Sequence, residues 1–139
     1  MQVFIVGTPF VTAMYLDNKR LNKQIIECNQ ILDALHGRKT GWKNHPCTIQ
    51  YKDHEKWLEH YVSCLTLYKH GAVVHAQICS QLADLSKPDF HTQEYFNNMK
   101  RRLYTKDHNH YKQWSELGES YENWYWVDNN WKIYKQKNV

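Results

Sequence analysis

The sequence predicts a mostly α-helical fold, a compact single domain over residues 1–139 that ends in an irregular aromatic tail. Apolar residues recur at helical spacing in several separate segments, as in amphipathic helices. The chain has only 3 Pro and 5 Gly, too few for an all-β chain with many tight turns. Its 139 residues are enough for one hydrophobic core.

The first elements are marked by clear local signals. Residues 1–6 are an apolar run that predicts a short buried strand or extended segment. Thr8-Pro9 combines a capping residue with Pro at the first helical position, which predicts a short helix to about Tyr15 or Leu16.

The clearest helix begins at Asp17 or Asn18 and runs to about His36, where Gly37 supplies a stop signal. Its apolar stripe consists of Leu21, Ile25, Cys28, Leu32 and Leu35. A second, polar face carries Arg20, Lys23, Gln24 and Glu27. Such a face is most often simply solvated.

Further helices are expected over residues 46–70, with a break or a polar turn at residues 53–55, and over 72–85. The helix over 72–85 carries the apolar residues Val74, Ile78, Leu82 and Leu85. Two more helices are expected over residues 92–103 and 107–114, and the irregular tail follows from residue 115.

Composition narrows the class of protein. The net charge of +4 suits a polyanionic partner but is too common to identify one. No 18-residue apolar run and no signal-peptide pattern occurs, so we expect a cytoplasmic protein without a membrane helix. The four cysteines lack CxxC spacing and are expected to be buried free thiols.

Two segments have both a functional and a structural interpretation. The basic run at residues 100–106, with Arg101 and Arg102, suits phosphate contacts or a solvated helix end. The tail tryptophans Trp124, Trp126 and Trp131 suit base stacking, although core packing is favoured for at least two of them.

We expect no metal and no cofactor; a metal held by His45, His91 or His108 is the less favoured alternative. His108-Asn109-His110 matches the letters of a nuclease motif but lacks the surrounding ββα-metal pattern. No Cys/His set has zinc-site spacing, and no glycine-rich phosphate loop is present.

Several motifs, taken in order, resemble the pyrimidine-dimer DNA glycosylase family, especially its small phage and bacterial members. They are Leu16-Asp17-x-Lys19-Arg20-Leu21-x-Lys23-Gln24, Gln30-Ile31-Leu32, Gly41-Trp42-Lys43-Asn44-His45-Pro46 and Lys106-Asp107-x-x-His110-Tyr111. The resemblance implies a compact helical fold that acts on double-stranded DNA, in the host-cell cytoplasm if the protein is phage-encoded. It also implies catalysis by the N-terminal α-amine, which attacks the sugar C1′ and forms a Schiff base with help from a helix-borne glutamate.

The chain departs from the family pattern at two places. Gln2 follows Met1, so Met1 is expected to be retained and its own amine would be the nucleophile. Gln24 stands where the catalytic glutamate would be, and Glu27, one turn later, is the substitute carboxylate.

The leading hypothesis is a DNA N-glycosylase with abasic-site lyase activity, in which Met1, Gln24 and Glu27 are catalytic. Phosphates would be held by Arg20, Lys23, Lys43, Arg101 and Arg102, while Trp42, Asn44 and His45 would approach the base or sugar. The alternative is a catalytically inactive family member that binds or sequesters nucleotides or nucleic acid. A plain protein-interaction module is a third interpretation, and the oligomeric state is open.

Overall fold

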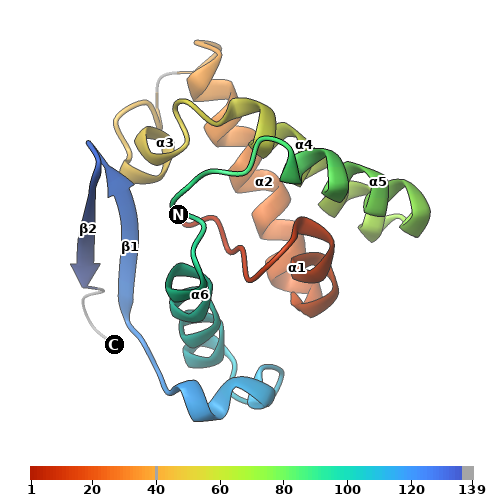
Figure 1. The fold of residues 1–139 in the computed structure, drawn as a ribbon, viewed down its shortest axis with the longest axis vertical. Coiled ribbons are helices and arrows are strands. Elements are labelled where there is room, and N and C mark those ends of the chain that lie inside the picture. The colour runs from red at the N-terminus through yellow and green to blue at the C-terminus, as the bar shows by residue number, and fades with distance from the viewer. Residues whose placement is uncertain (40, 136–139) are drawn as a thin grey trace. The chain divides into compact units, whose positions relative to one another are not determined.

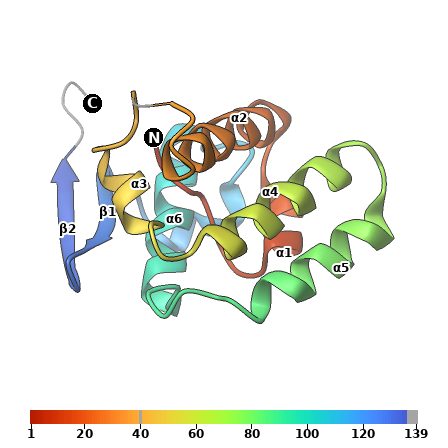
Figure 2. The same cartoon turned by 90° about the horizontal axis from the view of Figure 1, so that it is seen from above.

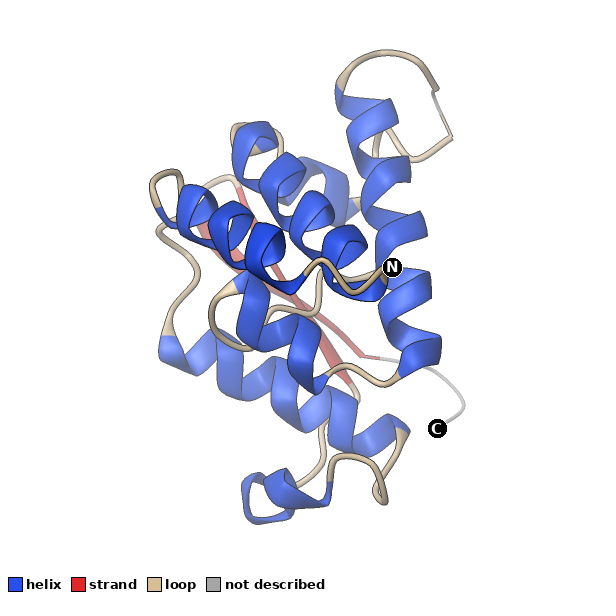
Figure 3. Cartoon of the chain, turned by 90° about the vertical axis from the view of Figure 1, so that its right-hand side faces the viewer, coloured by secondary structure: helices blue, strands red, loops and turns tan. Residues whose placement is uncertain are grey.

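The computed structural model describes residues 1–39 and 41–135, which form two compact units, residues 1–88 and 89–139. Helices dominate the described residues, and their strands form one small two-stranded sheet, so the predicted mostly α-helical fold is confirmed (Figure 3). The single-domain organisation stays a prediction, and each unit is described by itself.

Five helices build the first unit: α1 (Pro9–Tyr15), α2 (Asn18–Leu35), α3 (Pro46–Gln50), α4 (Glu55–Lys69) and α5 (Val73–Asp84), labelled in Figure 1. The expected break near residue 53 is present, because residues 51–54 separate α3 from α4. Helix α4 is central: it packs against α1, α2 and α5 and runs beside α5 (Figure 2).

The predicted helix signals act as expected at two of three positions. The Thr8 hydroxyl accepts a hydrogen bond from the Val11 backbone amide and caps α1, while Gly37 follows α2 with a φ of 73°. Asp17 precedes α2 without a side-chain cap, because its carboxylate instead accepts hydrogen bonds from Arg20, at 3.2 and 3.3 Å.

The segment before α1, residues 2–6, is extended and largely buried but belongs to no sheet. Buried backbone groups need hydrogen-bond partners, and here side chains supply them in place of a neighbouring strand. The Tyr61 hydroxyl donates to the Phe4 carbonyl at 2.9 Å, and the Thr12 hydroxyl oxygen accepts from the Val6 amide at 3.1 Å. The prediction of a buried extended segment is therefore confirmed.

Gln24 provides the largest share of these contacts. Its Oε1 accepts a hydrogen bond from the Phe4 amide and lies 3.0 Å from the Tyr61 hydroxyl, whose single proton it shares with the Phe4 carbonyl. Its Nε2 donates to the Gln2 carbonyl at 2.9 Å. The residue is only 2% exposed, so its assignment to the polar face of α2 was wrong. The buried face runs through Leu21, Gln24, Cys28 and Ile31, at spacings of three and four residues.

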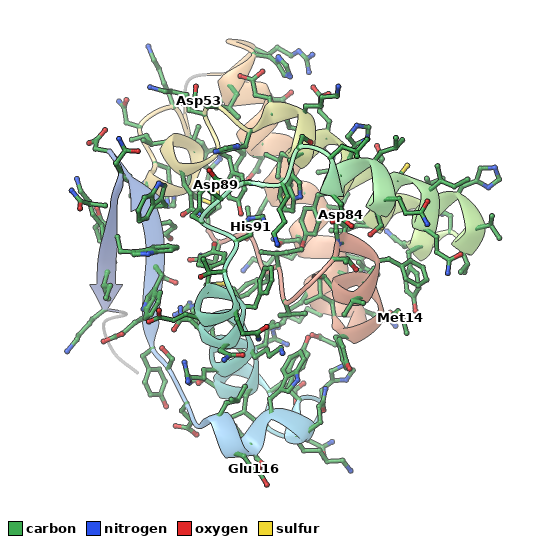
Figure 4. The ribbon with its side chains drawn as sticks, viewed as in Figure 1. Met14, Asp53, Asp84, Asp89, His91 and Glu116 are labelled. Atoms are coloured by element: carbon green, nitrogen blue, oxygen red, sulfur yellow. The ribbon has the colours of Figure 1, made fainter. Side chains whose placement is uncertain are left out.

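The predicted apolar face of α5 was also wrong. Val74, Ile78, Leu82 and Leu85 are exposed, and the buried face consists of Ala76, Ser80 and Ala83. Small side chains allow helix axes to approach closely, and the Ser80 hydroxyl oxygen accepts a hydrogen bond from the Phe10 amide at 3.0 Å. Helix α5 therefore packs by close approach and leaves its large side chains outside; Met14 of α1 is likewise exposed (Figure 4).

The second unit contains α6 (Gln93–Lys106), a 3₁₀ helix η1 (Lys112–Leu117), and the strands β1 (Glu122–Val127) and β2 (Asn130–Lys135). The strands form an antiparallel hairpin, which corrects the expectation of an irregular tail. Asp128 and Asn129 turn the chain with positive φ angles of 53° and 60°, as two-residue hairpin loops require.

The tail tryptophans pack mainly among themselves and against the buried start of this unit. Trp131 stacks on the buried Tyr95, with ring centroids 5.3 Å apart, and contacts Trp124 and Trp126. Each of the three indoles is half-buried. They therefore contribute to the packing of the hairpin, but none of the three is a fully buried core residue.

The Gln24 contacts lead to a prediction about the variant Gln24→Glu. One oxygen of the new carboxyl would accept from Phe4 and Tyr61, but the other would face the Gln2 carbonyl, which only a protonated carboxyl can satisfy. Burial and that carbonyl should raise the folded-state pKa above the value of about 4.3 in unfolded chains. Stability should be greatest below that value and fall as the pH rises through the folded-state pKa.

Urea unfolding from pH 4 to 8 measures this effect. At pH 8 we expect a loss of about 1–3 kcal/mol relative to the wild type, and little loss near pH 4. The matched control is Gln30→Glu on the same helix, where no such carbonyl contact exists among the described residues. Equal pH profiles for the two variants would contradict the proposed role of the amide.

Candidate functional site in residues 1–88

The start of the chain lies beside α3, at the point where the loop over residues 41–45 enters that helix (Figures 1 and 2). Met1 is half-exposed, whereas Gln2 and Val3 are buried. The Val3 backbone hydrogen-bonds the Cys47 sulfur at the first turn of α3. The extended segment thus fixes the place of the N-terminal amine on the first unit.

His45 lies within electrostatic range of this amine. Its Nδ1 accepts a hydrogen bond from the Cys47 amide at 3.0 Å and so caps α3. Partial burial lowers the pKa of His45, and the positive charge of the N-terminal ammonium lowers it further. A neutral imidazole is also what an accepting Nδ1 requires.

Trp42 packs edge-on against the His45 ring, with centroids 5.4 Å apart, and is itself exposed. Lys43 and Asn44, between them, are exposed as well. The predicted base or sugar contacts therefore lie together on one loop, and His45 connects that loop to the amine.

Glu27 completes the group from helix α2. Its carboxylate pairs with Lys23 across one helical turn at 3.7 Å, and its side chain is 16% exposed. The Glu27 charge acts on the Cys47 thiol, and so does the N-terminal ammonium. The amine, Glu27, His45 and Cys47 thus share one electrostatic environment at the edge of the first unit.

Cys47 belongs to this group, but its thiol is not expected to be reactive. Burial raises the pKa of its thiol to about 12, which outweighs the lowering by the ammonium and by the Val3 backbone. A thiol that stays protonated is a poor nucleophile. Cys47 instead holds Val3, and the Tyr61 hydroxyl holds Phe4. The sequence analysis missed both roles.

Gln24, a predicted catalytic residue, lies near the start of the chain but points into the interior. Both of its polar atoms hydrogen-bond residues 2–4 or Tyr61. The amide therefore positions the segment that carries the amine and faces no open space.

The predicted phosphate-binding cations differ in their availability. Lys23 is exposed and forms an ion pair with Glu27, whereas Lys43 is exposed on the loop. Arg20 is half-buried and pairs with Asp17 at 3.2 Å. The first unit therefore presents Lys23 and Lys43 to solvent beside the amine group, with Arg20 partly neutralised.

In the second unit the basic segment is largely used within the fold. Arg101 donates from Nε to the Leu117 carbonyl at 2.8 Å, and Lys100 lies over the Trp114 ring. Arg102 is only 5% exposed, and burial lowers its pKa. Arg102 is therefore enclosed by protein and is no surface contact for a duplex.

No three His, Cys, Asp or Glu side chains of residues 1–39 and 41–135 converge as a metal-ligand set. His91 is buried (Figure 4). Its ring stacks on the Tyr95 ring, with the ring centroids 5.8 Å apart. His108 contacts the Glu119 carboxylate at 2.6 Å. Among the same described residues, no helix is both long enough and apolar enough to cross a bilayer.

Comparison with known proteins identifies one family. The model of the pyrimidine dimer DNA glycosylase family matches residues 1–67, which include the amine, Glu27 and the loop with His45. No curated protein and no solved structure gives a significant match. The match supports the family that the sequence motifs indicated, over residues 1–67 of this chain.

Proposed function

We propose that this protein is a DNA N-glycosylase and abasic-site lyase that uses the Met1 amine as its nucleophile. The observation that supports the proposal is electrostatic: the charge of that amine acts on His45 and Cys47, and the Glu27 charge acts on Cys47, all inside the segment that the family model matches. Primary amines form Schiff bases with sugar aldehydes, and the pinned segment holds this one in place.

The reaction follows from amine chemistry. The neutral amine attacks C1′ of the deoxyribose as the bond from C1′ to the base breaks, and the base leaves with a proton. Loss of the amine proton and opening of the sugar ring give an iminium. Removal of a C2′ proton expels the 3′ phosphate, and water then hydrolyses the imine and restores the amine.

Glu27 is the residue that we assign to charge and proton handling. A carboxylate near the amine stabilises the cationic sugar as it forms and can carry protons between steps. Lys23 pairs with it across the solvent-exposed side of α2. We assign Gln24 the role of positioning the N-terminal segment, because its hydrogen bonds hold Gln2 and Phe4.

The loop over residues 41–45 would meet the substrate. Trp42 offers an exposed ring, and Asn44 offers an exposed amide that can donate and accept hydrogen bonds. An aromatic ring beside an extruded base stabilises the flipped state. Damaged or abasic sites suit this mode, because their weaker stacking lowers the cost of extrusion.

The second candidate is a family member that binds nucleic acid or nucleotides without cleaving them. The observation that favours it concerns Gln24, which we align with the family's glutamate: its neutral amide makes its hydrogen bonds within the fold. Binding of unchanged ligand, with no covalent adduct, distinguishes this candidate from the first.

Borohydride trapping tests the amine. Incubation of the full chain with an abasic duplex and sodium borohydride should reduce the Schiff base to a stable amine linkage, seen as a mass increase on Met1 after digestion. Adding two residues before Met1 should lower trapping at least about 100-fold, because the amine moves out of its fixed place.

Intact mass measured beforehand establishes that the purified chain begins at Met1. Extension of the chain at its other end is the matched control and should trap like the wild type. Trapping that persists on the N-terminally extended chain, or an adduct on a lysine, would overturn the assignment of Met1.

The variant Glu27→Gln tests the carboxylate. Strand cleavage of ultraviolet-damaged duplex should slow by about 10²–10⁴-fold if Glu27 handles protons or charge. Stability should change by less than about 1 kcal/mol, because the amide keeps the shape of the side chain and the lost pair joins Glu27 to an exposed lysine one helical turn away. Glu94→Gln, at an exposed position of α6, is the control, and equal rates for both variants would exclude the role.

The exposed cations beside the amine should govern the salt dependence of duplex binding. Each phosphate contact contributes a slope of about −0.9 in log K against log salt. We therefore expect Lys43→Gln to flatten the slope by about one unit, measured by fluorescence anisotropy. Lys56→Gln, exposed on α4, is the control, and unchanged slopes in both would place the duplex elsewhere.

A further inference from the structure

The second unit contains a pocket of about 470 Å³, within the size range of small-ligand sites. Its lining comes from α6, from the segment before β1, and from the open end of the hairpin. The residues that matter for recognition are Asn98, Arg101, Ser120, Glu122, Trp124 and Lys135. The pocket lies outside residues 1–67, to which the family match is confined.

A chain of hydrogen bonds makes one wall of the pocket rigid. The buried Asn98 accepts from the Ser120 hydroxyl at 3.3 Å, and that hydroxyl oxygen accepts from the Glu122 amide at 3.2 Å. The Ser120 amide donates to the Thr105 hydroxyl oxygen at 2.8 Å. The start of β1, and with it Glu122, is therefore fixed to helix α6.

Two carboxylates line the pocket, and they differ in what they can still accept. Glu119 is engaged on both oxygens, by His108 at 2.6 Å and by the Tyr121 hydroxyl at 3.1 Å. Glu122 accepts from the Trp124 indole through Oε2 at 3.4 Å, and its Oε1 has no partner among the described residues. Glu122 is thus the carboxylate that can receive hydrogen bonds from a ligand.

Two cations face the same pocket. Arg101 is anchored through Nε to the Leu117 carbonyl, which leaves its two terminal amino groups without a described acceptor. Lys135 lies opposite Glu122 in the hairpin register, yet the two make no ion pair in the part of the chain that the structure describes. The pocket therefore combines two cations with one accepting carboxylate and an indole.

We propose that this pocket binds a guanine nucleotide. Guanine presents two neighbouring donors, N1–H and N2–H, which match a carboxylate, and its ring can stack on Trp124. The phosphate would lie against Arg101 and Lys135. Adenine and cytosine present an acceptor beside their amino group, and uracil has a single N–H between two carbonyls, so none of them offers Glu122 two donors.

The proposal goes beyond the amine chemistry proposed for residues 1–67, and it needs no covalent step. A guanine nucleotide can reach the pocket as a free molecule or as an unpaired residue of a DNA strand. The chemistry recognised is the same in both cases, so the experiment compares the two sources.

Isothermal titration of the full chain with GMP, AMP, CMP and UMP tests the site. We expect GMP to bind at least about tenfold more tightly than the other three, and Glu122→Gln to remove that preference. Glu116→Gln, exposed on η1 and outside the pocket, is the control and should retain it. Equal binding of all four nucleotides, no binding of GMP at millimolar concentration, or an unchanged preference in Glu122→Gln would each overturn the proposal.

A second variant separates the contribution of the phosphate to binding from that of the base. It remains informative if Glu122→Gln fails to fold. Lys135→Gln should weaken GMP but leave guanosine unchanged, whereas equal effects on both would contradict the assigned phosphate contact. A thymidine oligomer with one central guanine, compared with the same oligomer without it, distinguishes strand from free nucleotide. Because borohydride trapping reports only on the amine, failure of either proposal is visible without the other.

Discussion

The structure of the first unit depends on the hydrogen bonds that hold residues 2–6 in its interior. An extended segment without a neighbouring strand leaves its amides and carbonyls to be satisfied by side chains. Four helices supply these side chains: Thr12 comes from α1, Gln24 from α2, Cys47 from α3 and Tyr61 from α4. The same bonds tie α2, α3 and α4 to the start of the chain. They therefore both hold these helices together and set the position of the N-terminal amine.

This arrangement explains why an amide suits position 24. The site needs an acceptor toward Phe4 and Tyr61 and a donor toward the Gln2 carbonyl. A glutamine supplies both without a charge, whereas an ionised carboxylate supplies no donor. The Gln24 side chain therefore holds the N-terminal segment, and the Glu27 carboxylate, about one turn later on α2, pairs with Lys23 and keeps some contact with solvent.

Charge serves different ends in the two units. In the first, Lys23 and Lys43 remain exposed near the amine, where they are available to an anionic partner. In the second, Arg101 and Lys100 make contacts within the fold, and the basic run of the sequence does not form a continuous surface stripe. The sequence shows how many cations a segment contains. Whether those cations can bind a ligand depends on the carbonyls and aromatic rings that the fold places against them.

Sequence by itself determined the helices, the Thr8 and Gly37 boundaries and the buried extended start, because each rests on local periodicity or capping chemistry. Its ordered motifs also indicated the family whose model matches residues 1–67. Only the tertiary structure decided that Gln24 and Arg102 are buried, and that α5 packs by its small residues. It also decided that the tail forms a hairpin, whose turn lacks the glycine that usually signals one. The physical reason is common to all: a pattern shows which residues share a face, while burial depends on what the rest of the chain packs against that face.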